Sequence, residues 1–122
     1  MNEPITVGLT MSGQDKLRQL KEDGYFSEMT DAYRFAIGLA LAHEAVADVS
    51  GGRSTMFNVG SLDPDKNIYH AVKALYQPQG VPVYTIAEGL AEWGVAHLHR
   101  LAESGELSFG KILSDSAELG QS

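Results

Sequence analysis

Cysteine is absent from this sequence of 122 residues. Its absence excludes a disulfide framework, thiolate chemistry and cysteine-based zinc sites, and fits a reducing compartment. No apolar run approaches the roughly 20 residues that a helix needs to cross a bilayer. Residues 1–4 lack the basic and apolar regions that begin a signal peptide. We therefore expect a cytoplasmic protein with no membrane partner.

Basic side chains are also scarce. Nine Lys and Arg against sixteen Asp and Glu give a formal net charge of −7. Neutralisation of phosphate supplies most non-specific affinity for DNA, so this composition argues against tight DNA binding by a single protomer. The length and the ordinary apolar content of 43% predict one domain over residues 1–122.

The four histidines invite a metal interpretation, but their spacing argues against it. His43-Glu44 begins like the two-histidine motif of zinc proteases, yet Ala47 stands where the second histidine is required. His97 and His99 are two residues apart on a predicted helix and face different directions. No serine–histidine–aspartate order or obvious pair of carboxylates marks a catalytic cleft. The sequence therefore predicts a non-enzymatic protein with no metal and no cofactor.

The first elements are a strand and a compact polar helix. The strand prediction rests on alternation over Ile5–Met11, which places Ile5, Val7, Leu9 and Met11 on one face and Thr6, Gly8 and Thr10 on the other. The helix is expected to start near Ser12, with Asp15 completing an approximate capping box. Leu17 and Leu20 form its inner side, and Gly24 ends it.

A long second helix follows. Thr30-Asp31 supplies an N-cap and an acid in the first turn. The stretch Ala32–Ala42 is apolar nearly all round, which predicts burial on several sides, and the helix is expected to continue through Ala47. In a chain this small, such burial is most easily reached against a second copy. The first strand has no evident partner in the sequence, which also favours an intermolecular ribbon.

This order resembles the ribbon-helix-helix unit, in which two chains pair their strands and interlock their helices. Residues 5–49 would form that unit. In such proteins, outward strand side chains enter the major groove, and N–H groups at the start of the second helix bind phosphate. Thr6, Gly8 and Thr10 would be the outward residues here, and they lack the side chains that discriminate bases.

The second half, residues 61–104, predicts two more helices after a short irregular or extended link at Ser54–Gly60. Ser61 or Asp63 is expected to cap the first of them, with Pro64 in its first turn. The apolar residues Ile68, Val72 and Leu75 recur at helical spacing in it.

The last predicted helix has the strongest start signal, the capping box Thr85–Glu88, and ends at residues 104–105. Its apolar side contains Ile86, Leu90, Trp93, Leu98 and Leu101. Residues 114–122 are polar and predict a frayed tail. The predicted class is therefore mainly α, with one short strand followed by about four helices in an intertwined oligomer.

The candidate DNA contacts follow from these elements. Lys16, Arg18 and Lys21 on the first helix either contact phosphate or form an ordinary solvated face. Arg34 either contacts phosphate or pairs with a carboxylate at an interface. The full set of candidate DNA-binding residues is Thr6, Thr10, Lys16, Arg18, Lys21, Thr30, Arg34 and Arg53.

Most of the chain resembles DndE, the small subunit of bacterial DNA phosphorothioation systems. The matching segments, in order, are the strand, Lys16–Lys21 before a glycine turn, Tyr33–Leu41, Phe57–Gly60, Ile68–Leu75 and Ala96–Leu101. The resemblance implies a mainly helical, non-catalytic homo-oligomer that binds duplex or nicked DNA through surface lysines. It would act beside a cysteine desulfurase, a sulfur-transfer enzyme and an ATPase.

Three hypotheses stand on these observations. The first is a DndE-like accessory protein of DNA sulfur modification or a related defence system. The second is a ribbon-helix-helix repressor or antitoxin, which predicts a dimer on a palindromic operator. The third is a protein-interaction scaffold without DNA affinity, which suits an acidic chain with few lysines.

Overall fold

The computed structural model describes residues 3–47, 51–77 and 79–107. It is mostly helical with a short antiparallel sheet, which confirms that the protein is mainly α. The elements run in the order β1 (Thr6–Leu9), α1 (Met11–Glu22), α2 (Met29–Ala42), β2 (Ser54–Asn58), α3 (Val59–Leu62), α4 (Asn67–Tyr76) and α5 (Val83–Glu103). The predicted frayed tail at 114–122 lies outside the described residues. Within those residues, no helix has the length and apolarity of a membrane span.

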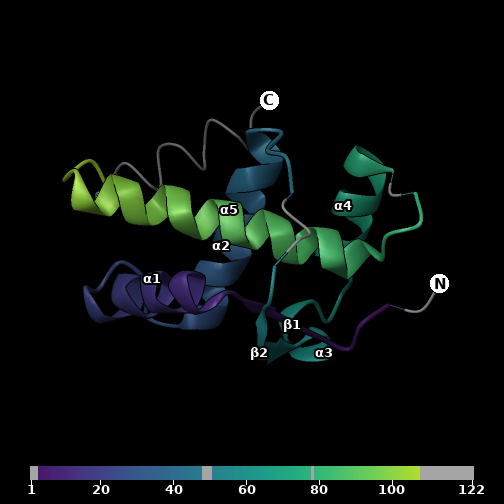
Figure 1. The fold of residues 1–122 in the computed structure, drawn as a ribbon, viewed down its shortest axis with the longest axis horizontal. Helices are drawn as coiled ribbons and strands as arrows, with labels where there is room; N and C mark the ends of the chain where they lie inside the picture. The colour runs from purple at the N-terminus through teal and green to yellow at the C-terminus, as the bar shows by residue number, and fades with distance from the viewer. Residues whose placement is uncertain (1–2, 48–50, 78, 108–122) are drawn as a thin grey trace.

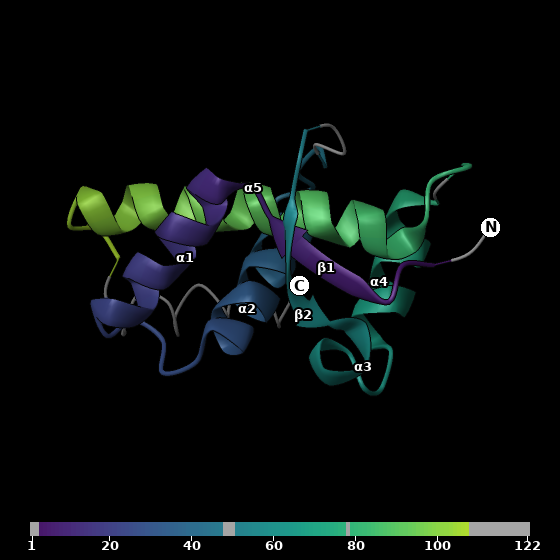
Figure 2. The same ribbon diagram turned by 60° about the horizontal axis from the view of Figure 1, so that its bottom comes forward.

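Helix α5 is the axis of the fold. It runs along the molecule, with α1 beside its C-terminal half, α4 near its N-terminal end and α2 crossing it (Figures 1 and 2). Strand β1 also packs on α5. An apolar helix that contacts several elements is buried over much of its surface. The buried residues of α5 include Ile86, Leu90, Val95 and Leu98.

Helix α2 is buried by its own chain. Tyr33, Ala36 and Ile37 are at most 1% exposed within the protomer. A Cβ added to Gly94 would lie 2.1 Å from the carbonyl oxygen of Ala36, so α2 and α5 cross with almost no space between their backbones. The prediction of several-sided burial is therefore confirmed. Since this burial needs no second copy, an interlocked oligomer stays a prediction.

The expectation that the first strand lacks a partner in the chain is wrong. β1 pairs antiparallel with β2, with Val7 opposite Phe57 and an irregular register between Val7 and Gly8. The sequence predicted only a link here, because the bulge breaks the alternation of β2. The strand face is also shorter than predicted. Val7 and Leu9 are buried, whereas Ile5 and Met11 are 76% and 78% exposed.

Helix α1 begins one residue before the predicted start. Thr10 is its N-cap, and the Gly13 N–H donates to Thr10 Oγ1 over 3.1 Å, so the capping box at Ser12 and Asp15 is wrong. Leu17 and Leu20 are buried as predicted. Gly24 ends the helical segment as predicted, with φ at +85°.

Helix α2 differs from its prediction at both ends. Its N-cap is Glu28, which places Thr30 inside the first turn rather than at the cap. It ends at Ala42, not Ala47. Glu44 adopts a left-handed conformation with φ of +51°, and the Ala45 N–H donates to the Ala40 carbonyl over 2.9 Å. This is the hydrogen-bond pattern of a Schellman motif, which closes the helix without glycine.

Carboxylates outside the two helices accept hydrogen bonds from the first N–H groups of α4 and α5. Asp63 is only 4% exposed and accepts from the Ile68 and Tyr69 N–H groups, each over 3.0 Å, at the start of α4. Asp63 therefore caps this helix as predicted, although Lys66 occupies the N-cap position. α5 begins at Val83, where Glu3 accepts from the N–H groups of Val83 and the next residue over 2.8 and 2.9 Å. The predicted capping box at residues 85–88 is wrong.

Candidate nucleic-acid interface

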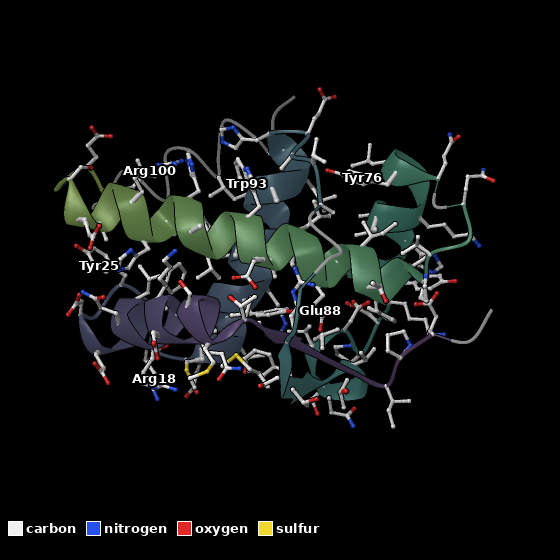
Figure 3. The ribbon with its side chains drawn as sticks, viewed as in Figure 1. Arg18, Tyr25, Tyr76, Glu88, Trp93 and Arg100 are labelled. Carbon is white, nitrogen blue, oxygen red and sulfur yellow. The ribbon has the colours of Figure 1, made fainter. Side chains whose placement is uncertain are left out.

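The cations of α1 lie on its outer surface. Leu17 and Leu20 face the core. Arg18 and Lys21 are three residues apart and share one side of the helix. Lys16 lies roughly 140° from Lys21 around the axis, so it flanks the buried stripe on the other side. Arg18 points away from α5 in Figure 3.

Ion pairing leaves the α1 cations largely available. Arg18 bonds Asp15 over 3.0 Å, but the two side chains are 51% and 73% exposed. Such an exposed pair contributes about 1 kcal/mol or less and opens readily. In the part of the chain that the structure describes, the side chains of Lys16 and Lys21 make no hydrogen bond or ion pair. These three side chains are therefore positioned to meet an external anion.

Of the three predicted reading residues, Gly8 and Thr10 bond to neighbouring helices, whereas the Thr6 hydroxyl lies at the surface, 3.4 Å from the Thr55 hydroxyl on β2. Glu88 on α5 accepts from the Gly8 N–H over 2.8 Å, and Glu92 accepts from the Thr10 N–H and hydroxyl, each over 2.9 Å. The Tyr33 hydroxyl donates to the Gly8 carbonyl over 3.0 Å. Side chains of α5 and α2 thus occupy both the N–H and the carbonyl of Gly8 on the edge of β1 away from β2. This leaves little room for a partner strand.

Arg53 is not a surface cation. Its side chain is 7% exposed and lies 3.9 Å from Glu88 Oε1 and 3.5 Å from Glu92 Oε1. Both carboxylates sit on α5 facing β1, and Glu88 is labelled there in Figure 3. Arg53 therefore balances the charge of two largely buried carboxylates. Burial, followed by the nearby charge of Glu88, raises the pKa of the Tyr33 hydroxyl, so this hydroxyl remains a donor in the same network.

The start of α2 is poorly suited to phosphate. Arg34 donates to the carbonyls of Leu62 and Ser61 over 2.8 and 3.0 Å, and its Nη1 lies 3.1 Å from Asp31. It therefore anchors α3 on α2. Thr30 lies in the first turn between two acidic residues, Glu28 and Asp31, whose charges repel an anion.

The surface is less acidic than the total charge suggests. Four carboxylates accept hydrogen bonds from backbone N–H groups inside the fold, where they cannot act as exposed surface charges: Glu3, Asp63, Glu88 and Glu92. Only the capping role of Asp63 could be predicted from the sequence, because the donors to Glu3, Glu88 and Glu92 lie about 80 residues away along the chain. The acidic composition is therefore a weaker argument against DNA contact than the sequence suggested.

No protein-family model, curated protein or solved structure matches this chain. The resemblance to DndE therefore remains a prediction from the sequence. The described residues contain no group of three or more His, Asp or Glu side chains positioned to hold a metal ion.

The structure also shows a cluster that the sequence did not predict. It consists of three aromatic rings, those of His43, Trp93 and His97, and the guanidinium of Arg100. The Trp93 and His97 rings stack with centroids 5.0 Å apart and planes within 8°. The His43 ring lies 5.5 and 5.3 Å from these two rings. Arg100 donates to His97 Nδ1 over 2.7 Å. Trp93 was expected on the apolar side of α5, but it is half-buried beside exposed His43.

His97 is the titratable centre of this cluster. Burial lowers its pKa, and the charges of Arg100 and His43 lower it further. Since arginine can only donate, His97 Nδ1 must be the acceptor, and protonation there would break the hydrogen bond.

We expect the fold to lose stability as the pH falls through the titration range of His97. A lowered pKa means that the folded protein binds fewer protons than the unfolded chain, so the free energy of unfolding falls below about pH 6.5. Urea unfolding at about pH 7.5 and about pH 5.5 measures the effect. His97→Gln should reduce the difference between the two pH values, whereas His70→Gln, at an exposed position, should leave it unchanged. An unaltered difference in His97→Gln would contradict this assignment.

Proposed function

We propose that this protein is a non-catalytic, DNA-associated accessory subunit similar to DndE. It would act in DNA sulfur modification or in a related bacterial modification or defence system. The observation that carries the proposal is the set of cations on α1, namely exposed Arg18 and Lys21 and half-buried Lys16, none of which is used in the core. The inward carboxylates support it, because they remove negative charge from the surface.

The contact would read the DNA backbone rather than the base sequence. Arg18 and Lys21 lie about one turn apart on one side of α1, which suits contact with phosphates of one strand. Few cations take part, so we expect weak binding that depends strongly on salt. The ribbon-helix-helix repressor is less well supported, since Thr10 and the backbone of Gly8 bond α5.

A protein-interaction scaffold is the second candidate, and an open groove favours it. The groove has a volume of about 430 Å³ and lies between the segment after α2 and the start of α5. Its walls are largely apolar and include Ala45, Val81 and Ile86, with Val46 exposed to 85% at its rim. Such a surface suits an apolar side chain from a partner protein.

DNA binding tests the first candidate. Lys16→Gln combined with Lys21→Gln should weaken binding to duplex and nicked DNA. The slope of log affinity against log salt should become shallower by about 2, because two phosphate contacts are lost. Fluorescence anisotropy with labelled intact, nicked and single-stranded DNA between about 50 and about 200 mM salt measures both effects.

The control removes the same charge from another helix. Lys66→Asn combined with Lys73→Gln acts near the Tyr69 ring on α4, and asparagine tolerates the left-handed backbone at position 66, where φ is +61°. This variant should bind DNA like the wild type. Equal losses in both variants would show that only net charge matters. Absence of binding at about 50 mM salt would reject DNA contact and favour the scaffold.

A further inference from the structure

The cluster of His43, Trp93, His97 and Arg100 lies apart from the α1 cations. In Figure 3, Trp93 and Arg100 project from the side of α5 opposite to the side on which α1 and Arg18 lie. Trp93 and His97 are partly exposed, and His43 and Arg100 are exposed. Trp93 packs against the edge of the core, yet it remains partly exposed in a parallel stack with His97.

We propose that Trp93, His97 and His43 form a stacking platform for an unpaired nucleobase, and that Arg100 binds the adjacent phosphate. The ligand is a single-stranded nucleic acid segment. This site is separate from the α1 contact and does not depend on it. A protein that binds duplex backbone through α1 would then hold unpaired bases on the opposite side of α5.

The ring geometry supports a base as the ligand. Flat aromatic side chains at a surface are the common platform for bases of single strands, because every base presents a π face. The stack of Trp93 on His97 is already formed, with planes within 8°, so binding need not order these rings. His43 comes from the end of α2 and extends the aromatic surface beyond α5.

The charges support a phosphate beside the base. Arg100 uses one N–H in the contact with His97 Nδ1, and its guanidinium has further donors for a phosphate oxygen. The cluster itself contains no carboxylate. The Glu103 carboxylate lies near another histidine, with its Oε1 3.7 Å from His99 Nε2. A proline-rich peptide also stacks on aromatic rings, but it has no anionic group to use Arg100.

Intrinsic fluorescence gives a direct test, because Trp93 is the only tryptophan in the sequence. An oligonucleotide of about 12 thymidines should quench Trp93, as should an RNA strand of uridines, whereas an abasic strand of equal charge should not. A fully paired duplex should quench far less. Equal quenching by the abasic strand, or no quenching by either base-containing strand, would overturn the proposal.

Variants separate the platform from the α1 site. Trp93→Leu should weaken binding of a labelled single strand roughly tenfold in anisotropy, since one stacking contact is lost. Arg100→Gln, at an exposed position, keeps the fold and should weaken binding severalfold while quenching at saturation persists. The Lys16→Gln, Lys21→Gln protein should keep the quenching, so failure of the α1 proposal would be seen separately. Quenching by a polyproline peptide but not by either strand would reject the nucleobase platform.

Discussion

Replacing Gly94 with alanine is expected to lower the free energy of unfolding by about 3 kcal/mol. The added Cβ would lie 2.1 Å from the Ala36 carbonyl oxygen, 2.6 Å from its carbonyl carbon and 2.7 Å from its Cα. All three are backbone atoms of α2, so no side chain can rotate to make room. The two helices would have to separate, which would loosen the main packing of the core. Urea unfolding followed by circular dichroism measures the loss.

Gly38→Ala is the matched control. Gly38 lies within α2 with nothing within 4 Å of its added Cβ, and it is exposed. Alanine is the better helix former, so this change should raise the free energy of unfolding by roughly 0.5–1 kcal/mol. If Gly94→Ala were as stable as the wild type, α2 and α5 would not approach as closely as the structure shows.

The features that the sequence predicted correctly depend on neighbours in the chain. The inner side of α1, Leu17 and Leu20, follows from helical spacing, and its end at Gly24 follows from the need for a left-handed residue. The many apolar residues of α2 predicted burial on several sides. The sequence could not identify α5 as the element that covers this helix, because composition does not say whether a later helix or a second chain does so.

The features that the sequence missed depend on contacts between distant residues. β2 bonds β1 across nearly half the chain, and its bulge hides the strand pattern. The sequence predicted a capping box of Glu88 with Thr85, but the Glu88 carboxylate accepts from the Gly8 N–H instead. No local pattern distinguishes the two uses, since both place a glutamate early in a helix.

In the candidate sites, too, some features follow from the local sequence and others depend on distant contacts. The exposure of the α1 cations follows from the amphipathic pattern of that helix. The burial of Arg53 does not, because its carboxylate partners lie on α5. The stacking platform was also hidden. Trp93, His97 and Arg100 share a face at helical spacing, which is a signal in the sequence, but His43 reaches them only because α2 crosses α5.

Arg53→Met is expected to cost about 3–5 kcal/mol of unfolding free energy, because it leaves Glu88 and Glu92 without their compensating charge. These two side chains are only 20% and 19% exposed, and hydrogen bonds from Gly8 and Thr10 fix them. Methionine fills much the same space, so the loss would reflect electrostatics rather than a cavity. Thermal and urea unfolding near neutral pH measure it.

Two further variants make the interpretation specific. Arg18→Met removes an arginine from an exposed pair and should cost less than about 1 kcal/mol. Adding Glu88→Gln and Glu92→Gln to Arg53→Met should recover much of the loss, because the amide oxygens still accept from Gly8 and Thr10 without a buried negative charge. If Arg53→Met cost no more than Arg18→Met, Arg53 would not be needed to balance the two glutamates. Its assignment to the core, in place of the predicted DNA contact, would then be wrong.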